Sequence, residues 1–222
     1  MPKIVDHAQR REELARVVWD VISRDGIEGV TVRKVADEAG VSVGGLRHYF
    51  DSQRGLLLFA AKAMADKVAA RITAHLDGDI PGRDRARLML EELLPLDADR
   101  RVDVDVWLAC MMRSRYDDAL AELQASGFPG ERHICRLAVA YACGQPAPER
   151  IGDPLGDPRL DRQSARLHTF VDGLTLHAAM YPREFPAEEI RRLLDEELTA
   201  LLPDPREDLG PPDSTGNQRS HQ

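Results

Sequence analysis

Apolar residues recur every three or four positions along most of this chain, which is the spacing of amphipathic helices. Between Arg11 and Arg24, for example, one face collects Leu14, Val17, Val18, Val21 and Ile22. Gly26 follows and is a typical helix end. No alternating strand pattern of useful length occurs in the 222 residues. The pattern therefore predicts an all-α fold with about nine helices.

Clusters of Pro and Gly divide the rest of the chain. Between them the pattern predicts helices over residues 52–76, 83–94, 99–115, 117–124, 131–143 and 159–180, and a last helix that starts at Pro186. The expected breaks lie at Asp77–Gly82, Ser126–Gly130 and Gly144–Pro158. The tail from Pro203 has little to bury and is expected to be disordered.

The most informative segment is Thr31–Phe50, TVRKVADEAGVSVGGLRHYF, in which Gly40 separates two short helical patterns. Ala36 is small enough for the two helices to approach closely, and Gly40 can adopt the positive φ that a tight turn needs. A small core would come from Val32, Val35, Val41, Leu46 and Phe50. This spacing predicts a helix-turn-helix whose second helix, residues 43–50, can enter a DNA major groove. Taken alone, the segment is equally compatible with a helical hairpin that binds nothing.

With its flanks, the segment resembles the tetracycline-repressor (TetR) family of one-component regulators over about residues 8–58. The matching residues are Gly26, Thr31, Val35, Ala36, Ala39, Gly40, Val41, Ser42, Gly44, Leu46, His48, Tyr49, Phe50, Ser52, Leu56 and Leu57. Asp172-Gly173-Leu174 also looks like a segment common in the betaine-regulator-like branch. The resemblance implies a DNA-binding domain at 1–52, an effector-binding and dimerisation domain at 53–202 and a disordered tail at 203–222.

The same resemblance implies a homodimeric regulator, in most relatives a repressor, that binds palindromic double-stranded operator DNA and releases it when a small-molecule effector binds. Residues 43–50 would be the recognition helix, beside a supporting helix that starts with Thr31 and Arg33. Phosphate contacts would come from Ser42, His48, Tyr49 and Gln53. For His48 a buried, hydrogen-bonded core position is an equal alternative.

Residue chemistry supports part of this assignment. Arg33 and Arg47 can each donate two hydrogen bonds to a guanine edge, and Gly44-Gly45 permits a close backbone approach to DNA. Val43, Gly45, Arg47 and Gln53 depart from the residues usual in the family. The operator sequence therefore cannot be transferred from relatives.

Dimerisation is predicted through the last two helices, whose apolar stripes could build a four-helix bundle across a two-fold axis. The predicted interface residues are Leu160, Leu167, Val171, Leu174, Ala178, Leu194, Leu198 and Leu201. Periodicity alone is equally compatible with stripes that face the chain's own core. A glycine at position 173 destabilises a helix, and its presence would be explained if another helix approaches the backbone closely there, at an interface.

The effector is expected to be apolar or amphipathic, because the candidate pocket residues are mostly apolar. These are Trp107, Cys110, Met111, Phe128, Tyr141, Phe170 and His177. For each of them ordinary core packing is the alternative. A further alternative is that residues 53–202 only dimerise and bind no effector.

Composition narrows the function further. The net charge is −8, but residues 1–56 contain nine basic and nine acidic residues, so the head is neutral and its DNA binding should be salt-sensitive. No eighteen-residue apolar run or apolar signal core appears, which predicts a cytoplasmic protein that does not bind membranes. Catalytic motifs are also missing, so neither an enzyme nor a cofactor is expected.

The three cysteines, Cys110, Cys135 and Cys143, lack the spacing of a disulfide framework. Cys135 and Cys143 would lie about 12 Å apart along a helix, too far to share one metal ion. His133 and Cys135 would point to different faces of that helix. No metal site is therefore expected.

Overall fold

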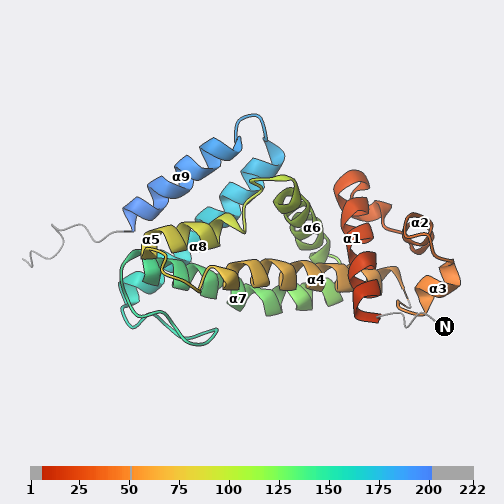
Figure 1. The fold of residues 1–222 in the computed structure, drawn as a ribbon, viewed down its shortest axis with the longest axis horizontal. Coiled ribbons are helices and arrows are strands. Elements are labelled where there is room, and N and C mark those ends of the chain that lie inside the picture. Colours follow the sequence, from red (N-terminus) through yellow and green to blue (C-terminus); the bar gives the residue numbers. More distant parts are fainter. Residues whose placement is uncertain (1–6, 51, 202–222) are drawn as a thin grey trace, which may run out of the picture.

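The computed structural model describes residues 7–50 and 52–201, and within them the chain is helical and has no strands. The helices are α1 (His7–Asp25), α2 (Val32–Glu38), α3 (Val43–Arg47), α4 (Gln53–Ala74), α5 (Gly82–Glu91), α6 (Ala98–Ser114), α7 (Asp118–Ala142), α8 (Pro158–Met180) and α9 (Ala187–Ala200). A short 3₁₀ turn, Ile27–Gly29, follows α1. This arrangement confirms the predicted all-α fold (Figure 1). The predicted disordered tail, 203–222, lies outside the described residues.

Short polar side chains determine where several helices begin, because they accept hydrogen bonds from backbone N–H groups that the first turn leaves without partners. Thr31 caps α2, Ser42 caps α3 and Ser52 caps α4, each through its hydroxyl oxygen. Aspartates do the same for α6, α7 and α8 at Asp97, Asp117 and Asp157. These six helix starts are thus encoded locally in the sequence.

Helices α1, α2 and α3 gather at one end of the molecule (Figure 1). Their core contains Leu14, Val18, Val35 and Leu46, all buried. The same apolar cluster continues into the first three turns of α4, as far as Met64, and includes residues of α6. The domain boundary at residues 52 and 53 stays a prediction, but the packing runs across it.

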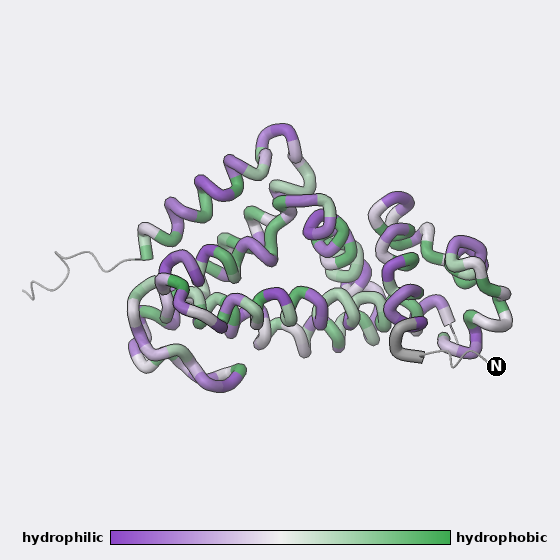
Figure 2. Tube along the Cα trace, viewed as in Figure 1, coloured by the Kyte–Doolittle hydropathy of each residue, from purple (hydrophilic) through white to green (hydrophobic). Residues whose placement is uncertain are grey.

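Helix α4 leaves the head and runs beside α7 into the body (Figure 1). There α5, α7, α8 and α9 enclose a second apolar cluster, which includes Leu94, Ala138, Leu167 and Leu194. Figure 2 shows α9 alternating between hydrophilic and hydrophobic residues along its turns. The apolar side of α9 packs on the body. An apolar stripe in the sequence shows only that a helix buries one side, and not whether the same chain or a second copy covers that side.

One predicted helix break is wrong. Residues 126–130, Ser-Gly-Phe-Pro-Gly, were expected to separate two helices, but α7 continues through them with Pro129 inside the helix. Proline costs a helix one backbone hydrogen bond, and glycine adds flexibility. The packing of α7 along α5, α6 and α8 outweighs these local costs.

The predicted dimer stripes face the chain's own core. Leu167, Val171, Leu174 and Ala178 of α8 are at most 5% exposed, and Leu194, Leu198 and Leu201 at most 3%. Leu160 is partly buried against the same cluster. Seven of the eight predicted interface residues are therefore already covered within one chain and leave little surface for a second copy. The apolar residues that α8 and the turn after it leave exposed are Leu176, Met180 and Tyr181.

Among the described residues, no helix is both long enough and apolar enough to span a membrane.

Candidate DNA-reading face and effector pocket

The α2-turn-α3 unit has the geometry of a helix-turn-helix. Gly40 adopts φ +63°, which confirms the positive φ expected at the turn. The Val41 N–H donates to the Ala36 carbonyl at 3.0 Å across this turn. Leu46 is completely buried and anchors α3 on the head core. The remaining faces of α3 are therefore free to point outward.

Helix α3 is shorter than predicted and ends at Arg47 instead of Phe50. After Leu46 the backbone tightens, because the Tyr49 N–H donates to the Leu46 carbonyl at 3.0 Å, three residues back. Two adjacent glycines in a five-residue helix reduce its intrinsic stability. Helix α3, the predicted recognition helix, is therefore little more than a single turn, held by its Ser42 cap and by Leu46.

Most of the predicted DNA contacts lie on the surface. Thr31, Arg33, Ser42, Gly44, Gly45, Arg47 and His48 are exposed, and Val43 and Tyr49 are half-buried. The alternative that His48 is a buried core residue is wrong. Its ring instead packs edge-on against the Tyr49 ring, with centroids 5.6 Å apart.

The cations of the head differ in whether a carboxylate of the fold pairs with them. Arg10 pairs with Glu13, Arg24 with Glu38, and Lys34 with Asp25 at 2.8 Å. Arg33 and Arg47 have no ion-pair partner among the described residues. A guanidinium without an internal carboxylate partner keeps its donors available for phosphate or base edges.

The side chain of Gln53 makes a hydrogen bond within the fold. Its amide Nε2 donates to the Val30 carbonyl at 2.5 Å and so ties the first turn of α4 to the segment before α2. Its predicted phosphate contact stays a prediction, and this donor would have to leave Val30 to make it.

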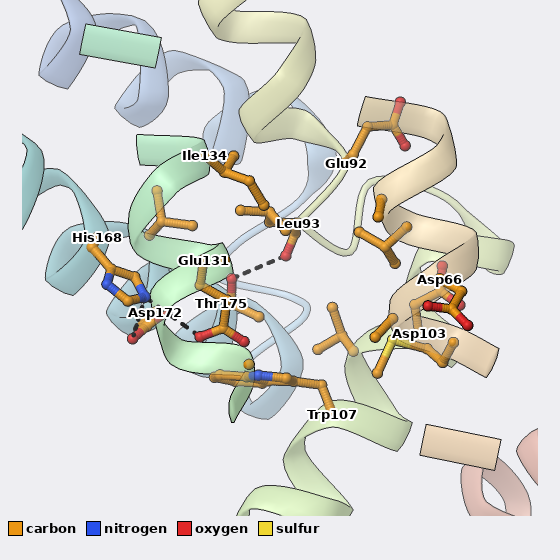
Figure 3. A pocket seen from close by; sticks show the side chains of 18 residues that line it. Asp66, Glu92, Leu93, Asp103, Trp107, Glu131, Ile134, His168, Asp172 and Thr175 are labelled. Carbon is orange, nitrogen blue, oxygen red and sulfur yellow. Dashed lines mark hydrogen bonds and ion pairs between the residues drawn. The ribbon is translucent and has the colours of Figure 1, made fainter. Parts of the chain in front are cut away.

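The body contains a pocket of about 300 Å³ between α4, α6, α7 and α8 (Figure 3). Its lining comprises Met64, Ala65, Asp66, Val68, Ala69, Glu92, Leu93, Asp103, Val104, Trp107, Gly127, Gly130, Glu131, Ile134, His168, Val171, Asp172 and Thr175. The volume is at the lower end of the range for drug-sized ligands. Carboxylates come from every one of these helices, and the lining includes no lysine or arginine.

At one end of the pocket, cations outside the lining hold the carboxylates. Glu92 accepts hydrogen bonds from Arg71, Arg100 and His75 at 2.7 to 3.1 Å. Burial opposes the charge of Glu92, but these hydrogen bonds outweigh it and lower its pKa to about 2. Asp103 pairs with Lys67 at 2.6 Å and with Arg71 at 2.8 Å. Glu92 and Asp103 are thus already compensated by cations of the protein.

At the other end, no lysine or arginine forms an ion pair with Glu131 or Asp172 among the described residues. Nε2 of His168 lies 3.5 Å from Glu131 and 3.7 Å from Asp172, and it has no hydrogen-bond partner among the described residues (Figure 3). His168 itself is only 3% exposed. Burial raises the pKa of Asp172. A cation placed here would relieve that electrostatic cost.

Of the seven predicted effector residues, Trp107 lines the pocket. Cys110 is buried in the first apolar cluster, where burial raises the pKa of its thiol to about 11. Phe128 is exposed, and its ring contacts that of His168 in a tilted arrangement, with centroids 5.2 Å apart. Tyr141 and Phe170 pack on the second cluster, Met111 is half-buried outside the lining, and His177 is exposed.

Sequence reasoning missed the acidic lining. Asp103 and Asp172 interrupt the apolar pattern of helices 99–115 and 159–180, and that interruption was the available signal. Which helix faces converge on one cavity depends on how four helices pack, which periodicity within one helix does not specify.

Two family models match the chain. The model described as bacterial regulatory proteins of the tetR family matches residues 18–60, and that of the BetI-type transcriptional repressor C-terminal domain matches residues 82–203. The transcriptional regulator PksA of Bacillus subtilis is 32% identical over 90% of this chain and 94% of its own length. BetI 2 of Chromohalobacter salexigens is 31% identical over 91% of this chain and 93% of its own.

Solved structures agree. A transcriptional regulator from Rhodococcus is 29% identical and matches with a TM-score of 0.72 over 86% of this chain and 95% of its own. A putative regulator from Saccharomonospora viridis, solved in complex with choline, has the same TM-score at 19% identity over 86% and 96% of the two chains. At that identity the second likeness concerns the fold alone.

The protein is therefore a helix-turn-helix transcriptional regulator and not an enzyme. It belongs to the TetR family, with a C-terminal domain of the BetI type.

Proposed function

We propose that this regulator is a dimeric repressor that binds a palindromic operator and releases it when an amphipathic organic cation occupies the pocket. The observation that carries the DNA half is the surface of α3. It presents Arg47 beside two glycines, with Arg33 of α2 nearby in the chain, and both arginines are exposed without an internal ion pair among the described residues. Arginine of this kind is the usual reader of guanine.

Operator binding is tested by gel shift on the DNA that flanks the protein's own gene, at low and at physiological salt. We expect a saturable shift that weakens steeply with salt, because phosphate contacts release counterions. A scrambled DNA of equal length and composition is the matched control. Failure to find a saturable shift at low salt would contradict the proposal.

The dimer is proposed through the outer face of α8. Leu176 is 41% and Met180 61% exposed, which is unusual for large apolar side chains on a helix that otherwise packs inward. On the same helix, a β-carbon at Gly173 would meet no atom of this chain within 4 Å outside the helix's own backbone. A second copy packed closely on this face would account for both features.

We expect Leu176→Glu and Gly173→Leu to give monomers in sedimentation velocity at micromolar concentration, with unchanged circular dichroism. Ala70→Glu, at an exposed position of α4, is the control and should remain dimeric. A dimer that survives both changes on α8 would move the interface elsewhere. Two heads related by a two-fold axis need operator half-sites about one helical turn or a small multiple of it apart.

The effector class follows from the charge of the pocket. The lining offers apolar walls, the flat ring of Trp107 and two carboxylates, Glu131 and Asp172. Among the described residues, no lysine or arginine forms an ion pair with either of them. Such a site favours a positively charged head group with an apolar body. A relative of the same fold was solved with choline, which is a ligand of this chemical kind.

Calorimetric titration can test the charge requirement. Choline and benzyltrimethylammonium are compared with the neutral tert-butyl analogue of choline, which keeps the shape and removes the charge. We expect binding only of the cations, and a loss of about tenfold or more in Asp172→Asn. Equal binding of the neutral analogue would contradict a cationic effector.

A dimer that binds DNA without any effector remains the alternative. It would be favoured if neither cations nor neutral compounds shift the unfolding temperature of the protein.

A further inference from the structure

Lys67 of α4 lies between the pocket and the head. Its Nζ is 2.6 Å from Oδ1 of Asp103, which lines the pocket, and 5.0 Å from the centroid of the Trp19 ring. Both distances are within the range of direct electrostatic attraction. One ammonium group therefore contacts a pocket carboxylate and a core residue of the head at the same time.

Trp19 is firmly part of the head. It is 7% exposed and belongs to the apolar cluster that also contains Leu46 of the recognition helix and Val35 of α2. Its indole N–H donates to the Ala60 carbonyl of α4 at 2.8 Å. A shift of Lys67 therefore changes its contact with Trp19, a side chain that packs with α2 and α3.

Asp103 is equally fixed on the pocket side. It is 4% exposed, and α6 carries it one turn before Trp107. Met64 and Val68 of α4 and Val104 of α6 form the pocket wall next to it. A ligand that separates α4 from α6 must lengthen the contacts of Asp103 with Lys67 and Arg71, because these ion pairs bridge the same two helices.

We propose that Lys67 is the residue that couples pocket occupancy to the orientation of the head. In the ligand-free protein it joins Asp103 to Trp19 and holds the head in its DNA-binding orientation. A ligand that spreads α4 and α6 breaks this link, and the head loses its fixed position. The inference rests on the proposed function, since it assigns the regulation of that same pocket.

The contacts of Lys67 with Asp103 and Trp19 would couple ligand binding in the pocket to operator binding by the head. Coupling of this kind is a free-energy difference, so operator binding must weaken ligand binding by the same factor as the ligand weakens operator binding. Removing Lys67 should reduce both factors together, whereas a merely structural role would change stability and leave the ratio intact.

The test compares Lys67→Met, Lys67→Arg and the control Lys62→Met, which removes an exposed lysine of the same helix. Arg71 still pairs with Asp103 in Lys67→Met, so the variant should fold. Operator affinity is measured by fluorescence anisotropy with and without benzyltrimethylammonium. We expect Lys67→Met to bind operator about tenfold more weakly without ligand, and to lose most of the ligand-dependent release. Lys67→Arg should restore both properties, and Lys62→Met should behave like the parent.

A spectroscopic readout follows the link directly. The chain has two tryptophans, Trp19 and Trp107, so fluorotryptophan labelling should give two ¹⁹F resonances, which Trp107→Phe assigns. We expect the Trp19 resonance to shift when benzyltrimethylammonium binds. In ligand-free Lys67→Met it should already be displaced in the same direction.

The outcomes separate the two proposals. If the cation binds and releases operator equally from the parent and from Lys67→Met, the coupling role of Lys67 is wrong and the effector proposal stands. If the cation does not bind, the effector class is wrong. The link is still supported in that case if Lys67→Met weakens operator binding and displaces Trp19, with rescue by Lys67→Arg, and it is overturned if the variant matches the parent.

Discussion

Two arginines of the proposed DNA-reading face, Arg33 and Arg47, and two carboxylates of the pocket, Glu92 and Asp103, hold their charges in opposite ways. Arg33 and Arg47 are exposed and have no ion pair among the described residues. Glu92 and Asp103 are about 95% buried, and cations of α4 and α6 hold them. An exposed arginine stays hydrated until a partner arrives, whereas a buried carboxylate must be compensated within the fold. Arg33 and Arg47 thus keep their charges available for a partner, while Glu92 and Asp103 also stabilise the protein.

The two sites also differ in how the chain builds them. The reading face comes from one segment of twenty residues, 31–50, whose turn and caps are local. The pocket gathers residues from 64 to 175 on four helices and one connection. Substitutions of exposed residues in 31–50 should therefore change DNA binding with little effect on stability, and substitution of the buried Glu92 should mainly change stability.

The largest expected effect is that of Arg47→Ala on operator binding. Two heads each lose a contact of about 1 to 3 kcal/mol, so specific binding should weaken by about 2 to 6 kcal/mol per dimer. Anisotropy titrations on operator and on scrambled DNA measure this loss. The unfolding temperature and the dimer should be unchanged. Arg115→Ala, at an exposed position at the end of α6, is the control, and parent-like binding by Arg47→Ala would show that α3 does not read bases.

Glu92→Gln should have the opposite profile. It leaves Arg71, Arg100 and His75 around a neutral group, and breaking a buried ion pair costs about 3 to 5 kcal/mol of unfolding free energy. Urea denaturation measures this loss, with the exposed Glu188→Gln as control. If Glu92→Gln were as stable as the parent, the charges at this end of the pocket would not support the fold.

The same residue predicts a dependence on pH. The pKa of Glu92 is about 2 in the folded protein and near 4.5 without its partners. A lowered folded pKa stabilises the protein above the unfolded value, and this contribution disappears as the pH falls from about 4.5 to about 2. Thermal unfolding of the parent should therefore decline over this window more steeply than that of Glu92→Gln. Parallel curves would contradict the assignment.

Pro129→Ala in α7 should stabilise the protein, and this effect should be smaller than the losses predicted above. Alanine restores a backbone N–H inside the helix, and proline in a helix interior costs up to about 3 kcal/mol relative to alanine. Hydrogen exchange of this turn should also slow, because the variant gains a backbone hydrogen bond that proline cannot make. Gly127 and Gly130 of the same turn line the pocket. Pro148→Ala, in the loop after α7, serves as the control. A less stable Pro129→Ala would indicate that the ring itself packs.

The smallest expected effects concern the two glycines of α3. Gly44→Ala should raise the unfolding free energy by about 0.5 to 1 kcal/mol, because alanine is the better helix former. Gly45→Ala should gain less, since its β-carbon would lie 3.2 Å from the Ser42 hydroxyl that caps the helix, against 4.0 Å at Gly44. Both variants should bind operator more weakly if DNA approaches this backbone. Unchanged affinity would place the DNA on another side of α3.

The local signals of the sequence were sufficient for most of the fold. Gly40, Ser42 and Leu46 specified the turn, the cap and the anchor of α3, because each acts within a few residues of its own position. The same local reasoning failed at Ser126–Gly130, where packing along the whole of α7 outweighs the cost of Pro129. It also assigned Leu167 and Leu194 to a dimer surface, although both are completely buried in this chain.

By itself, then, the sequence determined the helices, the helix-turn-helix and the exposed arginines, because spacing, capping and side-chain chemistry operate over one or two turns. Only the tertiary structure decided that Asp103, Asp172 and Trp107 share one cavity and that Lys67 joins it to Trp19. The physical reason is that a helical stripe fixes which residues share a face, while the neighbour of that face depends on how all the helices pack together.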